Sequence, residues 1–330
     1  MLKGLYVLSP ASYQLIYSPA DRGVIAQHLD VYAPPQTPQS VKETPAILRD
    51  LAVLVSGWGG PVLDEPFLAA APRLELVLYG AGSIRGLMTP LAWDRGIRVT
   101  SAYGANAIPV AEYTLSQVLW CLKRGWHYAL ATRQAGAYPP RVPVAGAYGS
   151  VVGIISLGMV GRRVCELLQA FDVEVIAYDP FATAETARQL EVELCALDEV
   201  FRRADVVSVH TPWLKETEGL ITGVHFAAMR PNAAFINTAR GAVVREPEMT
   251  AVLQQRPDLT AVLDVTHPEP PKPGSPLYTL PNVILTPHIA GSMDAECWRM
   301  GHTMAEELVR FVRGEPLRWE IHRDQASILA

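Results

Sequence analysis

The sequence predicts an α/β protein made of two doubly wound, parallel-sheet domains. Short apolar runs alternate with helical patterns along the chain of 330 residues, as parallel βαβ units require. The apolar runs of the second half are rich in Val and Ile without polar alternation, which is typical of strands buried on both faces of a sheet. A chain of this length has room for two domains with separate hydrophobic cores.

The first hundred residues contain five strand candidates with helical patterns between them. A longer helical pattern follows, and Pro109 is expected near its start, where a missing N–H costs nothing. The Pro-rich segment 136–143 then predicts a loop. The predicted strands cover residues 4–8, 28–32, 51–56, 74–78 and 97–100, and the predicted helices cover 64–71, 89–95 and 109–133.

A second alternating series begins at Val151 and predicts six further strands. The two blocks, joined by the long helix, indicate two domains with a cleft between them, and ligands of such sheets bind beyond the carboxyl ends of the strands. A last helix, over about 294–313, is long enough to return to the first domain. The predicted strands cover 151–155, 174–178, 206–210, 233–237, 261–265 and 282–286.

The composition excludes several classes of protein. Apolar residues make up 49% of the chain and charged residues 18%, as in a folded globular protein and unlike a disordered one. The formal net charge is −5 and no block of Lys and Arg occurs, which argues against a nucleic-acid partner and against an anionic membrane surface. No run approaches the ~18 apolar residues of a membrane span, and Pro10 ends an N-terminal apolar run too short for a signal peptide. We therefore expect a cytoplasmic protein.

The cysteines do not indicate disulfide bonds or a metal site. They lie far apart in apolar or helix-like stretches, and no Cys-x-x-Cys pair occurs. Buried reduced thiols therefore fit this pattern better than disulfides or metal ligands. The four residues are Cys121, Cys165, Cys195 and Cys297.

A dinucleotide-binding fingerprint follows the predicted strand 151–155. The segment Ser156-Leu157-Gly158-Met159-Val160-Gly161 opens a helix that is expected to run to about residue 171. Such glycines let the backbone approach a pyrophosphate, and the helix N-terminus binds the anion. Asp179 ends the next strand, 179 − 161 = 18 residues after the last glycine, where an acidic residue binds ribose hydroxyls. This carboxylate, followed by Pro180 and not by Arg, favours NAD over NADP.

Ser156 stands where this fingerprint has its first glycine. If the turn needs a positive φ, a Cβ there costs about 1–2 kcal/mol. Restoring glycine should then tighten NADH binding, if the turn is strained or the side chain crowds the pyrophosphate. The alternative is that the serine is accommodated and donates a hydrogen bond to phosphate. A βαβ unit that binds no nucleotide is a further alternative.

Three later strand ends each supply a polar residue suited to hydride chemistry on a 2-keto acid. Arg240 can bind a carboxylate bidentately and polarise the carbonyl, and His288 can supply a proton near neutral pH. A carboxylate such as Glu269 beside the imidazole favours its protonated form and orients it. Each residue alone could be a surface or loop residue, and His267 is the rival to His288. His210 is expected to line the cofactor cleft rather than to catalyse.

These segments together resemble the signatures of the D-isomer-specific 2-hydroxyacid dehydrogenases. They keep the order and spacing of that family from about residue 74 to residue 291. Two departures are Ser156 and Arg85, the second at a position where many members carry an acidic or polar residue. The segments are 96–100, 109–115, 204–212, 236–241, 263–265 with 269–270, and 285–291.

The resemblance implies a Rossmann NAD-binding domain over 101–291, inserted into a flavodoxin-like substrate domain formed by 1–100 and 292–330. It also implies a homodimer formed around the NAD-binding domains. Arg240 would anchor the substrate carboxylate, and His288 would be the acid/base with Glu269 as its partner. The expected NAD-binding residues are Ser156, Gly158, Met159, Val160, Asp179, His210, Thr211, Pro212, Thr238, Ala239, Asp264 and Gly291.

Candidate substrate-binding residues come from the first domain. The resemblance implies that amides of the loop 80–84 bind the substrate carboxylate. Trp58 follows a predicted strand and could cover an apolar substituent, whereas Arg85 is either a surface or inter-domain residue or a second anion anchor. The segment 55–61 contains no Lys or Arg, which favours an unphosphorylated substrate. The expected residues are Trp58, Ala81, Gly82, Ser83 and Arg85.

The sequence therefore predicts an NAD-dependent oxidoreductase that interconverts a small D-2-hydroxy acid and its 2-keto acid by hydride transfer. One alternative is a dinucleotide-sensing binding protein of the same fold, since fold does not fix function. Another is a related dehydrogenase that acts on a different oxyanion, such as phosphite.

Overall fold

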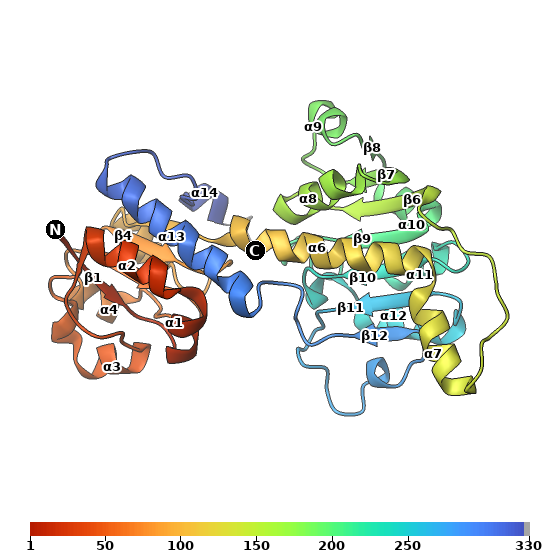
Figure 1. Cartoon of the computed structure of the whole chain (residues 1–330), viewed down its shortest axis with the longest axis horizontal. Coiled ribbons are helices and arrows are strands. Elements are labelled where there is room, and N and C mark those ends of the chain that lie inside the picture. The colour runs from red at the N-terminus through yellow and green to blue at the C-terminus, as the bar shows by residue number, and fades with distance from the viewer. Residues whose placement is uncertain (327–330) are drawn as a thin grey trace. The chain divides into compact units, whose positions relative to one another are not determined.

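The computed structural model describes residues 1–326 and consists of two compact units. Unit 1 is formed by Met1–Asn106 and Ser292–Ala330, and unit 2 by Ala107–Gly291. The chain thus passes between the units after residues 106 and 291, where the sequence places the divisions after 100 and 291. Each unit contains one parallel sheet, so the predicted class of two doubly wound α/β domains is confirmed (Figure 1).

Unit 1 has five parallel strands in the order β2-β1-β3-β4-β5, which is the flavodoxin-like order. Residues alternate between the faces of this sheet: Val53 and Val55 pack with helices α1, α2 and α13, and Leu54 packs with α4 and α5 on the other face. The elements are β1 Leu2–Tyr6, α1 Pro10–Ile16, α2 Pro19–His28, β2 Leu29–Val31, α3 Pro38–Glu43, β3 Val53–Ser56, α4 Glu65–Ala70, β4 Leu76–Tyr79, α5 Pro90–Asp94, β5 Arg98–Ser101, α13 Cys297–Val312 and α14 Arg323–Ala326.

Unit 2 has seven parallel strands in the order β12-β11-β10-β9-β6-β7-β8, and Figure 1 shows them side by side. The order turns at β6, where a doubly wound sheet binds its ligand. The elements are α6 Tyr103–Leu122, which begins in unit 1, α7 Gly125–Ala135, β6 Tyr148–Ile155, α8 Met159–Leu168, β7 Asp172–Tyr178, α9 Ala184–Gln189, β8 Glu193–Leu194, α10 Leu197–Arg203, β9 Val206–Val209, α11 Gly223–Ala228, β10 Ala234–Asn237, α12 Glu246–Gln255, β11 Thr260–Leu263 and β12 Val283–Leu285.

Both faces of the unit 2 sheet carry a hydrophobic core. On strand β10, Phe235 packs against α10, α11 and α12, while Ala234 and Ile236 share the opposite core with α6 and α8. Strands enclosed in this way have no polar face, which explains the Val- and Ile-rich runs in the sequence.

The single helix predicted over 109–133 is wrong. The chain forms two helices there, α6 and α7, because Arg124 between them adopts a left-handed conformation with φ 52°. Pro109 lies inside α6 and not near its start, because the helix already begins at Tyr103. Its ring nitrogen cannot donate to the carbonyl of Ala105, so one helical hydrogen bond is missing at this point.

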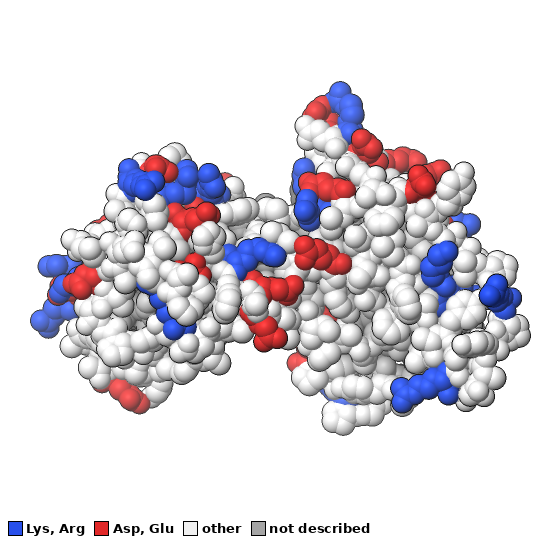
Figure 2. Space-filling model, in the orientation of Figure 1, with Lys and Arg blue, Asp and Glu red and all other residues white. Residues whose placement is uncertain are grey.

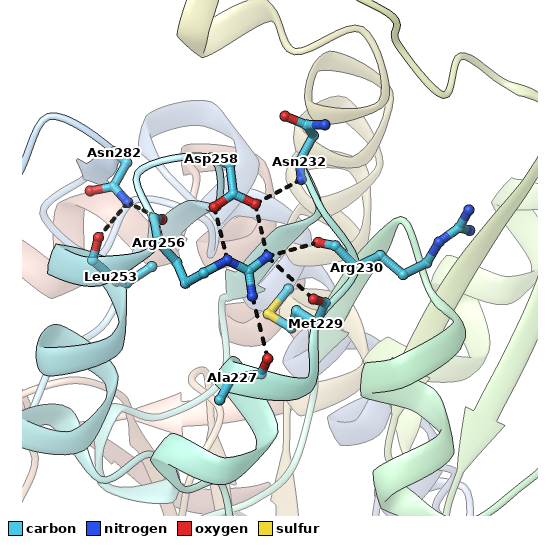
Figure 3. A network of polar contacts seen from close by, with 8 residues as sticks. All are labelled: Ala227, Met229, Arg230, Asn232, Leu253, Arg256, Asp258 and Asn282. Atoms are coloured by element: carbon cyan, nitrogen blue, oxygen red, sulfur yellow. Dashed lines mark hydrogen bonds and ion pairs between the residues drawn. The ribbon is translucent and has the colours of Figure 1, made fainter.

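A polar network holds the amino ends of strands β10, β11 and β12 (Figure 3). The guanidinium of Arg256 pairs with Asp258 and also donates to carbonyls at the end of α11 and just after it. Asp258 accepts the N–H of Asn232, and the Asn282 amide donates to the carbonyls of Leu253 and Arg256. The candidate catalytic residues lie at the opposite, carboxyl ends of these strands.

Two further features concern residues 1–326 as a whole. None of their helices is both long and apolar enough to cross a membrane. All four cysteines are unpaired, and burial raises the pKa of the Cys121 and Cys165 thiols to about 12.

Candidate functional site

The loop between β6 and α8 carries the predicted phosphate-binding fingerprint. Gly158 is the N-cap of α8, and no side chain caps this end of the helix. A Cβ built on Gly158 would have no atom within 4 Å, whereas one built on Gly161 would lie 2.0 Å from the carbonyl oxygen of Ser156. Gly161 therefore allows the helix to pack against the loop. Gly158 leaves open space beside the amides of Met159 and Val160 at the helix N-terminus, a geometry suited to an anion.

Ser156 adopts the positive φ that its place in the fingerprint requires. Its φ is 75°, a conformation that costs a residue with a Cβ about 1–2 kcal/mol. The Ser156 N–H donates to the carbonyl of Tyr178 at 2.8 Å. Its hydroxyl lies 2.9 Å from the hydroxyl of Thr211, a residue only 2% exposed, and this hydrogen bond offsets part of the strain.

Asp179 follows strand β7 and contacts the same loop. Its Oδ2 accepts the N–H of Leu157 at 2.7 Å, and its Oδ1 accepts the N–H of Phe181 at 2.8 Å. Each oxygen keeps further acceptor capacity, so the carboxylate can still bind hydroxyl groups. The pairing of glycine loop and acidic strand end therefore fits a dinucleotide with a free ribose diol.

His210 lies directly after β9, and its N–H donates to the carbonyl of Ile155 at 2.9 Å. The ring Nε2 is 3.1 Å from the Ser208 hydroxyl, while Nδ1 is buried and has no hydrogen-bond partner among residues 1–326. Burial lowers the pKa of His210 to about 3, so the ring is neutral at physiological pH. A neutral ring with an unpaired nitrogen beside the β6 loop fits a bound polar group there and does not fit a proton carrier.

Arg240 lies in the turn that follows strand β10. The side chain of Asn237 braces this turn, since its Nδ2 donates to the Arg240 carbonyl and its Oδ1 accepts the Ala239 N–H, both at 3.0 Å. The Thr238 hydroxyl lies 3.0 Å from that of Thr114 on helix α6. The sequence alone did not indicate the bracing role of Asn237, although a polar residue at the end of an apolar strand was a usable signal.

Glu269 and His288, expected as partners, are in contact. The Nδ1 atom of His288 lies 2.6 Å from Oε1 of Glu269, and about half of each side chain is exposed. The contact leaves Nε2 of the ring available for proton transfer. His288 has φ 55°, so this turn holds the histidine in a left-handed conformation.

The carboxylate of Asp264, which is 2% exposed, fixes the turn that carries His288. Its Oδ1 accepts the Thr286 hydroxyl at 2.6 Å and the Ile289 N–H at 2.9 Å, and its Oδ2 accepts the Ala290 N–H at 2.9 Å. The His288 N–H donates to the Asp264 carbonyl at 3.0 Å. Asp264 therefore positions the turn that carries His288, a role that the sequence alone did not indicate.

His267, the rival proton carrier, has a different neighbour. Its ring packs edge-to-face on Trp213, with centroids 5.1 Å apart. A Cβ on Gly241 would lie 2.0 Å from the carbonyl carbon of Thr266, so the Arg240 turn packs closely on the loop that carries Glu269. The contact between His288 and Glu269 therefore favours His288 over His267 as the residue that works with Glu269. No local pattern in the sequence predicted the Trp213–His267 contact.

The expected substrate residues lie in two loops of unit 1. Trp58 follows β3 and is 37% exposed. After β4, the carbonyls of Ala81 and Gly82 accept the buried Ser101 hydroxyl, which fixes this loop. The N–H of Ala81 already donates to the Tyr79 carbonyl at 2.8 Å, so this amide is engaged within the loop.

The other two expected residues continue the second loop. Ser83 is half-buried and Arg85 is exposed. Arg85 lines an open hollow of about 270 Å³ together with Ile84, Met88 and Trp93.

Comparison with known proteins identifies similar chains. Residues 116–290 match the family described as D-isomer specific 2-hydroxyacid dehydrogenase, NAD binding domain. The chain is 32% identical over 256 residues to a D-3-phosphoglycerate dehydrogenase of Archaeoglobus fulgidus, covering 78% of this chain and 49% of that protein. The chain thus spans about half the length of such relatives. It is 30% identical over 284 residues to a glyoxylate reductase of Korarchaeum cryptofilum, covering 85% of each.

Solved structures share the fold. A phosphoglycerate oxidoreductase from Rhizobium etli superposes with a TM-score of 0.83 at 24% identity, covering 99% of this chain and 100% of that one. The NAD-complexed form of a D-isomer specific 2-hydroxyacid dehydrogenase from Lactobacillus delbrueckii ssp. bulgaricus gives a TM-score of 0.79 at 21% identity, covering 97% and 100%.

Proposed function

The chain belongs to the D-isomer-specific 2-hydroxyacid dehydrogenase family, and we propose that it is an NAD-dependent oxidoreductase interconverting a small D-2-hydroxy acid and its 2-keto acid. The observation that carries this proposal is the 2.6 Å contact between His288 and Glu269. It occurs at the carboxyl edge of the sheet whose β6 loop carries the nucleotide fingerprint. An imidazole held by a carboxylate at this edge is an acid/base device.

NAD is the cofactor of this proposal, and unit 2 is its binding domain. When bound, NAD would supply the hydride acceptor for oxidation of the hydroxy acid, and NADH would supply the hydride donor for reduction of the keto acid. Asp179 supports NAD over NADP, because its carboxylate would repel a 2′-phosphate. The residues that we assign to the cofactor are Ser156, Gly158, Met159, Val160, Asp179, His210, Thr211, Pro212, Thr238, Ala239, Asp264 and Gly291.

The protein groups divide the remaining chemistry. In the reduction direction His288 gives a proton to the oxygen on C2, and in oxidation it takes that proton back. Glu269 holds Nδ1, which orients the ring. Arg240 binds the substrate carboxylate and polarises the carbonyl, which is the task suited to a planar, permanently charged guanidinium.

We assign substrate binding to unit 1, through Trp58, Gly82, Ser83 and Arg85, whereas the N–H of Ala81 is already engaged with the Tyr79 carbonyl. The strand-end loop that carries Trp58 contains no Lys or Arg, which supports an unphosphorylated substrate. The face drawn in Figure 2 carries interspersed acidic and basic groups on each unit, which suits a small-molecule partner rather than nucleic acid or a membrane. We also propose a cytoplasmic location.

We further propose a homodimer formed through unit 2. Helices α6 and α7 expose large apolar side chains, among them Trp120 at 47% and Leu130 at 41%. Exposed apolar groups on adjoining helices support a protein partner. Size-exclusion chromatography with light scattering tests this proposal, and a monomer at micromolar concentration would contradict it.

The activity is tested by following NADH oxidation with a panel of keto acids. The panel comprises glyoxylate, pyruvate, hydroxypyruvate, phenylpyruvate, 2-ketoisocaproate, oxaloacetate and 3-phosphohydroxypyruvate. We expect turnover of an unphosphorylated member, and a clear preference for the phosphorylated one would refute the substrate proposal. NADH binding without any turnover would favour a dinucleotide sensor, and NAD reduction by phosphite would favour a related dehydrogenase that acts on phosphite.

A further inference from the structure

The loop after β6 is held by several hydrogen bonds. The N–H of Ser156 donates to the Tyr178 carbonyl, and the N–H of Leu157 donates to Asp179 at 2.7 Å. The Leu157 carbonyl accepts Nε of Arg162 at 2.8 Å. These bonds tie the loop to the end of β7 and to helix α8. None of them ties it to β9, the strand on the other side of β6.

The hydroxyls of Ser156 and Thr211 make that remaining connection. Strands β6 and β9 pair as far as Ile155 and Val209, and the N–H of His210 adds one more bond to the Ile155 carbonyl. Just beyond this last backbone bond, the two hydroxyls lie 2.9 Å apart. A glycine at position 156 would leave this connection unmade, since it has no side chain.

Two hydroxyls in contact use only one of their two O–H groups on each other. One hydroxyl donates a hydrogen bond to the other, and the O–H of the accepting hydroxyl remains available for a second hydrogen bond. A hydroxyl that is already engaged in such a chain is also polarised, which strengthens its next hydrogen bond. Ser156 lies in the loop that leads into the uncapped N-terminus of α8, and Thr211 reaches it from the end of β9. A Cβ on Gly158 of this loop would meet only open space.

We propose that Ser156 and Thr211 act as one paired hydrogen-bond donor. The pair fixes the phosphate loop, and its remaining O–H donates a hydrogen bond to a pyrophosphate oxygen of the dinucleotide. This inference rests on the proposed NAD-dependent function. It gives a physical role to a serine at a left-handed position where glycine would be free of strain. Ser156 is then a cofactor-binding residue because of its hydroxyl, and Thr211 acts both as its support and as part of the donor.

Four variants of the full chain test the pair by NADH fluorescence titration. Ser156→Ala keeps the Cβ and removes only the hydroxyl, and Thr211→Val removes the partner hydroxyl at nearly constant shape. Each should raise the Kd for NADH about tenfold, the loss expected for one hydrogen bond to a charged group. The matched control Thr211→Ser keeps the hydroxyl and should stay within about twofold of wild type.

Ser156→Gly separates strain from donation. It should leave the melting temperature of the protein without nucleotide unchanged or higher, and still weaken NADH binding several-fold. Tighter NADH binding by Ser156→Gly would overturn the proposal, because strain would then outweigh the hydroxyl. Unchanged affinity in both Ser156→Ala and Thr211→Val, with normal melting temperatures, would overturn it as well.

Competition by ADP-ribose and by adenosine then locates the contact. We expect Ser156→Ala to weaken the binding of ADP-ribose, which contains the pyrophosphate, about tenfold and to leave the binding of adenosine unchanged. Equal weakening of adenosine would show a general loss of loop structure and would overturn the donor role. If the wild-type chain bound no NADH, the proposed function would fail together with this inference. Normal wild-type binding with unaffected variants would reject the inference alone.

Discussion

Burial of the His210 ring should lower the free energy of unfolding in acid. Burial lowers the pKa of this imidazole to about 3, whereas the ring in the unfolded chain binds a proton near pH 6.5. As the pH falls below 6.5, the unfolded state therefore gains a proton that the folded state cannot accept. The free energy of unfolding drops by about 1.4 kcal/mol per pH unit in this window, and the loss is complete near pH 3.

Because pH 5 lies about 1.5 units below 6.5, this one group lowers the free energy of unfolding at pH 5 by about 2 kcal/mol. The variant His210→Gln removes the titrating group and keeps an amide that can bond to the Ser208 hydroxyl. We expect the drop in unfolding free energy between pH 7.5 and pH 5.0 to be smaller by about 2 kcal/mol in this variant than in wild type.

Urea denaturation followed by tryptophan fluorescence measures both free energies. Other groups that titrate in this range contribute equally to the two proteins and cancel from the comparison. His322→Gln, which replaces an exposed histidine of unit 1, serves as the matched control and should keep the wild-type difference. If His210→Gln and wild type lost the same free energy, the assignment of His210 as a buried neutral ring would be refuted.

Four further predictions concern the proposed catalytic and cofactor-binding residues. His288→Ala should lower kcat by roughly 10²–10⁴-fold while NADH still binds, and near-normal turnover would bring His267 forward as the proton carrier. Glu269→Gln should lower kcat less than this, because an amide still orients the ring. Arg240→Ala should raise the KM for the keto acid at least about tenfold with little change in the Kd for NADH, and the reverse pattern would contradict its role. Asp179→Ala should reduce the kcat/KM preference for NADH over NADPH about tenfold, and an NADPH preference in wild type would refute the cofactor assignment.

The sequence was sufficient for the strands of both sheets except the short β8, Glu193–Leu194, because the other strands are enclosed. Runs such as that around Phe235 have no polar face, so periodicity alone located them. It was insufficient for the break at Arg124, because a left-handed arginine between two helices has no local signature. The positive φ at Ser156 followed from the glycine fingerprint, since the motif specifies backbone shape as well as residue type.

The candidate site was predictable where one residue type suits one task. Glu269 and His288 follow neighbouring strands and meet as expected. The anchoring by Asp264 was not predictable, because its partners lie 22 to 26 residues further along the chain and include two backbone amides. The contact between Trp213 and His267 likewise depends on which loops adjoin, which only the fold determines.

The most direct test of the proposed activity is the chirality of the product. The purified protein is incubated with NADH and the keto acid that it reduces fastest, and the hydroxy acid is resolved by chiral chromatography. We predict one equivalent of the D-2-hydroxy acid for each NADH oxidised. Formation of the L-isomer, or NADH binding without any hydroxy acid, would contradict the proposal.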